Sequence, residues 1–315
     1  MNEINFSNLS CPRCKSSLIL SQDNNIKCQN LECPHNDQDD WFSIIEGIPI
    51  LISNKTLDTV FDPNKMGSLV KRSDQSSFLY KLKKSIQVDS KKTVNNCSRF
   101  LKLIKKLNKS PDILVIGSGE KGGGTNELYG DRDISLTLTD IYASENVQYV
   151  CDAHYLPFKS SAFDGVWIQA VLEHVVEPKV VVDEIYRVLK ADGYVYAETP
   201  FMQQVHEGAF DFTRYTVLGH RYLFKNFNSI LIGGNGGTGE VLYWSIKHFL
   251  WSLFRSKNIA RVISFPFMLL FKIAEKFTDK RSLYDSSSGV FFLGKKSSKS
   301  ISHRDLADLY EGFQK

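Results

Sequence analysis

The sequence predicts an α/β fold with a Rossmann-like sheet, a small cysteine-bearing module near the N-terminus and a helical insertion late in the chain. Three observations carry this prediction. An apolar run over residues 113–116 breaks into a glycine-rich turn, a second apolar run ends on the acid Asp140, and two closely spaced cysteine pairs lie within residues 1–53. Apolar runs of this length that are bounded by turn residues are typical of buried strands.

The composition is that of an ordinary globular protein. The chain has 315 residues, of which 42% are hydrophobic and 23% are charged, and a net charge of +4. These values allow one sizeable domain and a small one, and the mild charge does not demand a nucleic-acid partner. No apolar run approaches the length of a membrane-spanning helix, so we expect a cytoplasmic protein, with peripheral membrane contact as an option.

Residues 1–53 predict a zinc ribbon. Cys11 and Cys14 form a C-x2-C pair, and Cys28 and Cys33 form a C-x4-C pair. Four thiolates can close a tetrahedron around Zn²⁺, and a site filled by protein ligands alone is structural. Disulfides are the rival interpretation, but the polar first residues show no secretory signal, and a cytosolic chain favours metal. His35 offers an alternative to Cys33, although we expect this histidine to lie on the surface.

Residues 54–110 form a basic linker that is predicted to be helical where it meets the first strand. Apolar residues recur at helical spacing over residues 100–107, with lysines on the other side. Such a face can contact RNA phosphates, anionic lipid or only solvent, and the solvated interpretation is favoured.

The glycine-rich turn is predicted to cradle a nucleoside-bearing cofactor. Gly117, Ser118 and Gly119 follow the first strand, where glycines let the backbone approach a ligand closely. Asp140 ends the next strand, where it can accept hydrogen bonds from ribose hydroxyls. Residues 123–125 are poor helix starters, which disfavours a dinucleotide whose pyrophosphate needs a helix N-terminus. A plain glycine turn and a capping role for Asp140 are the structural alternatives.

Strands and helices alternate beyond this turn. A short strand ends at Asp152 and Ala153, the next ends at Gln169, a helix covers residues 178–189, and a further strand covers residues 194–198. Asp152 has the same capping alternative as Asp140, and Gln169 has the alternative of a polar strand end.

These segments contain the motifs DAxxLPF, FDxV, LEHV, EIxRVLKxDG and TP, in that order after Asp140. The order closely resembles the class I S-adenosylmethionine-dependent methyltransferases of the type 11 group, over residues 111–224. The resemblance implies methyl transfer on a seven-stranded sheet, with S-adenosylmethionine as cofactor. It places Gly117 and Gly119 under the cofactor, Asp140 at the ribose, Ile141 against adenine, Asp152 at the adenine amino group beside Ala153, and Gln169 near the methionine moiety. Val115 stands where the family has an acid, and Glu120 is a candidate to compensate.

The ribbon adds a second resemblance. A paired-cysteine ribbon that runs into EGIPIL is similar to the small zinc-ribbon proteins that activate methyltransferases. It is also similar to the ribbon in front of some ribosomal RNA guanine methyltransferases. Either resemblance agrees with the domain that follows.

The loop after the TP motif is predicted to roof the acceptor site, because ligands bind beyond the carboxyl ends of strands in an open α/β sheet. It carries the run HExxxDFxRYT, which is found in methyltransferases that act on small molecules or glycans. His206 is the first candidate for a general base, with Glu207 and Asp211 behind it, and Arg214 could clamp a carboxylate or phosphate. Loop salt bridges and helix caps are the structural alternatives.

The rest of the chain completes a methyltransferase domain over residues 111–296. An aromatic-rich helical insertion over residues 240–284 suits a membrane surface, a substrate cleft or a dimer seam, and Pro266 is expected to break it. Residues 233–239 are expected to form a flexible glycine turn, residues 289–294 a last strand and residues 297–315 a polar tail.

The function that these motifs and the resemblance favour is transfer of a methyl group from S-adenosylmethionine to a glycan, lipid-linked or other small acceptor. The alternatives are an RNA methyltransferase, which the ribbon and the basic linker favour, and a non-catalytic methyltransferase-like partner protein, which Val115 keeps open.

Overall fold

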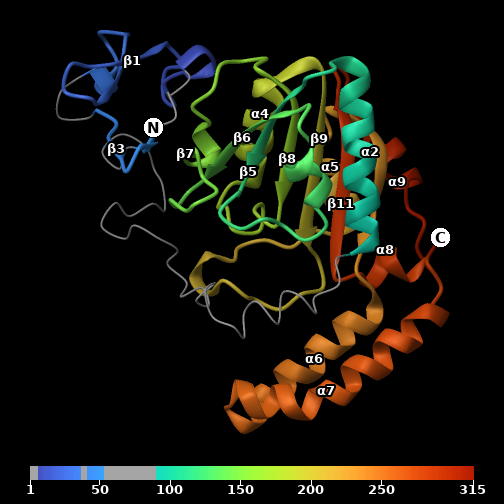
Figure 1. Ribbon diagram of the computed structural model, residues 1–315. Coiled ribbons are helices and arrows are strands. Elements are labelled where there is room, and N and C mark those ends of the chain that lie inside the picture. Colours follow the sequence, from blue (N-terminus) through green and yellow to red (C-terminus); the bar gives the residue numbers. More distant parts are fainter. Residues whose placement is uncertain (1–5, 37–40, 53–89) are drawn as a thin grey trace. The chain divides into compact units, whose positions relative to one another are not determined.

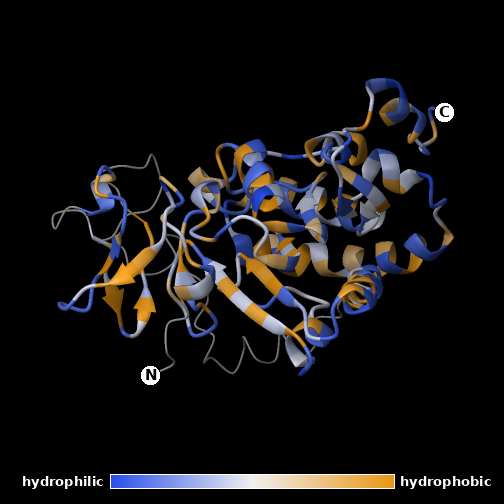
Figure 2. Cartoon of the chain, turned by 90° about the horizontal axis from the view of Figure 1, so that it is seen from above, coloured by the Kyte–Doolittle hydropathy of each residue, from blue (hydrophilic) through white to orange (hydrophobic). Residues whose placement is uncertain are grey.

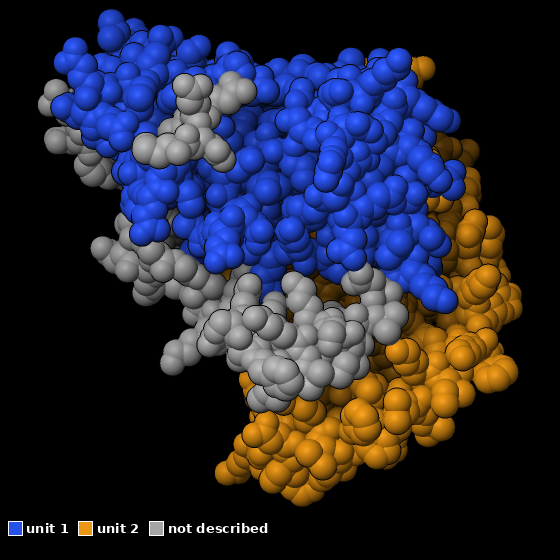
Figure 3. Space-filling view, viewed as in Figure 1, with its two compact units in different colours: residues 1–168, 177–195 blue, residues 169–176, 196–315 orange. Residues whose placement is uncertain are grey.

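The computed structural model describes residues 6–36, 41–52 and 90–315 (Figure 1). The chain divides into two compact units (Figure 3). Unit 1 holds residues 1–168 and 177–195, and unit 2 holds residues 169–176 and 196–315. Most of the basic linker, residues 53–89, lies outside the described residues.

A seven-stranded sheet organises the fold, in the order β10-β11-β9-β8-β5-β6-β7. The strands β5, β6, β7 and β8 pair in parallel, and β11 runs antiparallel to β10. This mixed, Rossmann-like sheet confirms the predicted fold class, including the last strand inserted beside β9. The strands are β5 (Asp112–Ile116), β6 (Ser135–Asp140), β7 (Tyr149–Val150), β8 (Phe163–Gln169), β9 (Leu189–Pro200), β10 (Phe227–Asn235) and β11 (Gly289–Lys296).

The central strands are apolar because helices cover them. The first six residues of β8 are buried, as expected of a parallel strand that is covered on both faces. Helix α2 (Lys91–Leu107) packs Phe100 edge-on against Trp167, with 5.4 Å between ring centroids. Gly165 permits this close approach, because a Cβ there would lie 2.4 Å from Ile104. Figure 2 shows hydrophobic residues concentrated along the strands.

The cysteine-bearing module consists of two short antiparallel hairpins inside unit 1. They are formed by β1 (Leu18–Leu20) with β2 (Ile26–Cys28), and by β3 (Ile44–Ile45) with β4 (Ile48–Pro49). The chain then continues the sheet at its β7 edge: Ile50 bridges in parallel to Val150, and the Leu51 N–H donates to the Val150 carbonyl at 2.8 Å. The module therefore covers an edge strand that would otherwise expose unpaired backbone groups.

Helices complete both units. They are α3 (Asn126–Gly130) and α4 (Pro178–Val188) in unit 1, and α5 (Val217–Leu223), α6 (Thr238–Phe254), α7 (Lys257–Ala274), α8 (Ser282–Ser286) and α9 (His303–Asp308) in unit 2. The 3-10 turns are η1 (Phe6–Asn8), η2 (Pro34–Asn36), η4 (Ala153–Tyr155), η5 (Gly208–Phe210) and η6 (Glu275–Phe277). Among the described residues, no helix combines the length and apolarity needed to cross a membrane.

Two local predictions about the late helical region are wrong. Helix α7 continues through Pro266. The carbonyl that loses its hydrogen-bond partner there belongs to Val262, which is 74% exposed, so water can satisfy it. The stretch expected to be a flexible turn instead contributes Gly233 and Gly234 to β10, which pairs with β11. Gly234 allows tight packing, because a Cβ there would lie 2.3 Å from the Leu283 carbonyl oxygen.

Candidate functional site

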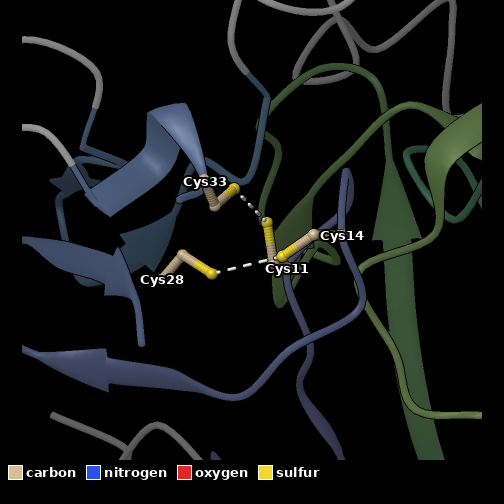
Figure 4. A group of neighbouring side chains, drawn as sticks. All are labelled: Cys11, Cys14, Cys28 and Cys33. Carbon is tan, nitrogen blue, oxygen red and sulfur yellow. Dashed lines mark hydrogen bonds between the residues drawn. The ribbon is translucent and has the colours of Figure 1, made fainter. Parts of the chain in front are cut away.

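The four cysteines of the module converge on one point (Figure 4). All four Sγ atoms lie within 4.8 Å of one another, and two pairs are closer: Cys11 to Cys33 at 3.8 Å and Cys14 to Cys28 at 3.4 Å. A tetrahedron with Zn–S bonds of about 2.3 Å has sulfur–sulfur edges of about 3.8 Å. All four cysteines are free thiols, so the donor set fits a structural Zn²⁺ and the disulfide alternative is not seen.

Backbone geometry shapes this cluster. Lys15 adopts a left-handed φ of 63° directly after Cys14, and its N–H donates to the Cys11 carbonyl at 2.9 Å, which closes the first knuckle. The Asn30 N–H donates to the Cys28 Sγ at 3.4 Å, a contact that favours thiolate. Burial raises the pKa of Cys28 to about 12 and that of Cys11 above its usual range, so metal binding must release protons.

His35 corrects one expectation. It was predicted to lie on the surface, but it is fully buried and packs its ring against Phe42 at 4.5 Å between centroids. Its ring is part of the small hydrophobic core of the module. The metal-ligating cluster consists of the four cysteines and does not include His35.

The glycine turn and Asp140 form one hydrogen-bonded cradle in unit 1. Gly117 adopts a φ of +80°, where glycine is favoured, and its N–H donates to the Thr139 carbonyl at 2.8 Å. The Gly119 N–H donates to Asp140 Oδ2 at 2.8 Å, and the Tyr142 N–H donates to Oδ1 at 3.1 Å. A carboxylate oxygen can accept more than one hydrogen bond, so the bonds of Asp140 to the loop are compatible with the predicted role at a ribose hydroxyl. Ser118 is fully buried behind the turn.

The other predicted cofactor residues occupy strand ends. Asp152 is buried and caps the turn η4, accepting from the His154 N–H at 2.9 Å and facing the ring Nδ1 at 2.6 Å. Ala153 begins η4, and Ile141 packs beside the apolar cluster of Ile50. The capping alternative for Asp152 is therefore seen, and its contact with adenine stays a prediction.

Gln169 belongs to unit 2, where it contacts a carboxylate that sequence reasoning missed. Its Nε2 donates to Glu198 Oε2 at 3.0 Å, and Glu198 also accepts from the Tyr196 hydroxyl. Ala170 follows with a left-handed φ of 54°, a strained conformation for a residue with a Cβ. A buried acid in an otherwise apolar strand was the signal that could have identified Glu198.

The loop that carries the predicted catalytic residues is held by Asp211 and Arg214. The two side chains form two hydrogen bonds, and Arg214 Nε also donates to the Gln203 carbonyl at 3.0 Å. Burial alone would raise the pKa of Asp211, but the hydrogen bonds from Arg214 hold it well below its usual range. The N–H donors of Arg214 therefore bind acceptors within the loop. This supports the prediction of a loop salt bridge over the prediction that Arg214 binds the acceptor substrate. Glu207 begins the same loop and is half-buried.

The predicted base His206 lies in a cluster that the sequence did not reveal. Its Nδ1 faces Asp211 Oδ2 at 3.2 Å, and its Nε2 lies 4.0 Å from Glu173 Oε1. The His174 Nε2 approaches the same Glu173 oxygen at 3.6 Å. Glu173 and His174 are the two central residues of the LEHV motif, which indicated the family resemblance but no chemical role for either side chain.

Glu173 is an exceptional carboxyl group. It is fully buried, and neither carboxyl oxygen has a hydrogen-bond partner among the described residues. Burial raises its pKa to about 8. The backbone carbonyl of Glu173 is satisfied by contrast, since the Phe212 N–H donates to it at 2.7 Å. Buried polar groups are usually satisfied, so this one requires an explanation.

Residues 114–197 match the family described as Methyltransferase domain, and no curated protein matches the chain. Similar solved structures include a putative sarcosine dimethylglycine methyltransferase from Galdieria sulphuraria, with 18% identity over 66% of this chain and 85% of that chain and a TM-score of 0.42. A SAM-dependent methyltransferase from Archaeoglobus fulgidus has 16% identity over 70% of this chain and 100% of that chain, with a TM-score of 0.43. A complex between the Haloferax volcanii Trm112 methyltransferase activator and a putative methyltransferase gives 14% identity over 66% of this chain and 96% of that chain, with a TM-score of 0.38.

The family match identifies residues 114–197 as a methyltransferase domain, and the mixed seven-stranded sheet that contains these residues is Rossmann-like. The same chain carries a cysteine cluster near its N-terminus.

Proposed function

We propose that this methyltransferase transfers the methyl group of S-adenosylmethionine to a glycan, lipid-linked or other small acceptor, and that its cysteine cluster holds a structural Zn²⁺. The observation that carries the choice of acceptor is the helical hairpin α6–α7, which displays apolar side chains to solvent. Methylation of RNA and a non-catalytic role are the two alternatives, and the experiments described next distinguish them from this proposal.

The cradle of unit 1 is suited to the cofactor. Gly117 and Gly119 would pass beneath it, and Asp140 would accept from its ribose hydroxyls while keeping its bond to the Gly119 N–H. When bound, S-adenosylmethionine supplies a methyl group on a sulfonium, so the acceptor atom bonds to carbon as the carbon–sulfur bond breaks and S-adenosylhomocysteine leaves. Positioning supplies much of such catalysis. A hydroxyl acceptor must also lose a proton, and the cluster of Glu173, His174 and His206 contains the groups suited to that task.

The hairpin α6–α7 supports an acceptor with a lipid part. Contiguous exposed apolar surface on a protein marks an interaction site. Lysines accompany the aromatics, as where the Lys257 Nζ lies 4.4 Å from the Trp251 ring centroid, a combination typical of helices that lie in a membrane interface. The loop of Gln204 contacts this hairpin through Ser245 at 3.2 Å. The most exposed apolar side chains of α6 and α7 are Phe249 (67%), Leu253 (61%), Val262 (74%), Leu270 (58%) and Ile273 (58%), and Phe277 (85%) follows in η6.

The first test is calorimetric titration with S-adenosylmethionine and S-adenosylhomocysteine. Micromolar binding, about −8 kcal/mol, is expected in the wild type. The Asp140→Ala variant should weaken it at least tenfold, because it loses both the ribose acceptor and the bond to Gly119. The variant Asp183→Ala, which removes an exposed acid on α4, should bind like the wild type. Absence of binding in folded wild-type protein would contradict the enzyme and move the interpretation to a non-catalytic partner.

The acceptor is then sought with labelled methyl donor on glycan, glycolipid and RNA fractions. Label in the glycan or glycolipid fraction is expected. Label in RNA with salt-dependent binding would replace this proposal by the RNA alternative.

Membrane contact is checked by co-sedimentation with anionic phospholipid vesicles. Phe249→Ser combined with Val262→Ser should reduce the bound fraction severalfold. Leu31→Ser, a change at an apolar residue of the module that is 86% exposed, is the matched control.

A further inference from the structure

We propose that Glu173, His174 and His206 form a binding site for a divalent first-row transition metal, separate from the cysteine cluster. The first argument is proximity. One ligand atom from each of the three residues lies within 4.8 Å of the others. Metal bonds of about 2.0–2.2 Å place tetrahedral N and O ligands about 3.4 Å apart. The observed separations of 3.6 and 4.0 Å from Glu173 to the two Nε2 atoms need only a small contraction around an ion.

The second argument is the protonation state that each histidine is forced to adopt. The His174 Nδ1 lies 2.7 Å from the Phe210 carbonyl oxygen, which can only accept, so Nδ1 carries the proton. The His206 Nδ1 faces the Asp211 carboxylate at 3.2 Å and is held in the same way. Both Nε2 atoms are therefore free to donate a lone pair. A histidine whose other nitrogen donates to a carbonyl or carboxylate is the usual arrangement of a metal ligand.

The third argument is Glu173 itself. Among the residues that the structure describes, its two buried carboxyl oxygens have no hydrogen-bond partner, and both histidine nitrogens lie too far from them for a direct hydrogen bond. A buried unpartnered carboxyl group is costly, and a cation held with two imidazoles would satisfy it. The geometry thus presents three ligand atoms that have no better partner than an ion.

The chemistry of the donor set indicates the class of metal. Two imidazoles and one carboxylate suit Mn²⁺, Fe²⁺, Co²⁺ or Zn²⁺, whereas four thiolates select Zn²⁺. Three protein ligands leave coordination positions open, as in catalytic sites. In the reaction, a role that rests on the function proposed above, an open position would hold the acceptor hydroxyl and lower its pKa, so that its proton passes to water as the oxygen takes the methyl group. His206 then acts as a ligand and not as the general base.

The test uses the full chain with its cysteine cluster loaded with Zn²⁺. Mn²⁺ is titrated and its free fraction followed by electron paramagnetic resonance, and Co²⁺ is followed by its visible absorption. One Mn²⁺ per chain is expected. Its affinity should fall at least tenfold in Glu173→Gln and in His206→Gln. It should not change in His303→Gln, which alters an exposed histidine of α9. Circular dichroism establishes that each variant is folded.

The outcomes separate this proposal from the preceding one. The site is overturned if neither ion binds beyond the cysteine cluster, or if both variants bind Mn²⁺ as tightly as the wild type. In that case Glu173 is a buried neutral acid, and His206 returns as the candidate base. Binding of S-adenosylhomocysteine, measured on the same metal-free protein, depends on Asp140 and tests the proposed function independently.

Discussion

The two clusters of metal-ligating side chains differ in how their ligands are distributed along the chain. The cysteine cluster draws four identical ligands from 23 consecutive residues, Cys11 to Cys33. The second cluster joins neighbours in LEHV to His206, which lies beyond a helix and a long strand. The first is closed and uniform, and the second is open and mixed. Four ligands of one type can be brought together within a short stretch of chain, whereas Glu173, His174 and His206 come together only through the folding of a longer stretch.

The largest expected effect comes from removing thiols. Cys11→Ser combined with Cys33→Ser should eliminate about one Zn²⁺ per chain and lower the melting temperature by about 10 °C or more, because structural zinc contributes directly to folding. Elemental analysis and thermal unfolding measure both quantities. Cys97→Ser, at a buried thiol of α2, should leave the metal content unchanged. Equal metal loss in this control would refute the assignment.

The next effect concerns a buried histidine that serves neither cluster. Burial lowers the pKa of His220 to about 3, from 6.5. The unfolded chain therefore binds a proton below pH 6.5 that the folded chain rejects, so stability is lost as the pH falls from 6.5 toward 3. The loss approaches about 1.4 kcal/mol per pH unit. Urea unfolding at pH 6.5 and 4.5 should show a smaller pH slope in His220→Gln, and an unchanged slope in His303→Gln. Equal slopes in wild type and His220→Gln would contradict this account.

A smaller effect is expected where the module attaches within unit 1. The Lys15 Nζ pairs with Glu184 Oε2 at 2.9 Å and donates to the Leu156 carbonyl at 3.3 Å. Lys15→Ala should lower the free energy of unfolding by about 1 kcal/mol, in the range for a partly buried pair. Lys27→Ala, elsewhere in the module, is the control. A change no larger than that of the control would show that the backbone contacts of the module, among them the pairing at β7, attach it without this ion pair.

The smallest effect is expected at the mixed cluster. Glu173→Gln in metal-free protein should change the free energy of unfolding by less than about 1 kcal/mol, because an unpartnered carboxyl is replaced by an amide of the same shape. Denaturant unfolding checks this. A large loss would mean that Glu173 supports the fold, and the contrast between the two clusters would disappear.

Sequence patterns predicted what depends on local periodicity. The strand that ends at Asp140, the helix from Pro178 and the cysteine pairs all follow from spacing within short windows, and the structure contains them. The cofactor residues remain predictions, although Asp140 and Gly119 are bonded to one another.

Burial and long-range contacts were not accessible in this way. Nothing in the letters of LEHV states that the Glu173 carboxyl is fully buried with no hydrogen-bond partner among the described residues, or that His206 lies near it. The sequence alone suggested that Arg214 is free to bind an acceptor. The structure shows that its guanidinium binds Asp211 instead, a contact that depends on how the loop folds. Helix α7 continues through Pro266, and Val262, whose carbonyl loses its hydrogen-bond partner there, is 74% exposed, an exposure that the sequence does not give.

Because Ile50 pairs with Val150 of the same chain, attachment of the cysteine module does not depend on protein concentration. A module that adds a strand to a sheet edge from a separate chain would dissociate on dilution. Here the two partners belong to one polypeptide, so their association is intramolecular and its effective concentration is set by the connecting chain. The cysteine module should therefore stay in place, in a one-to-one ratio with its catalytic domain, however little of the protein a cell contains.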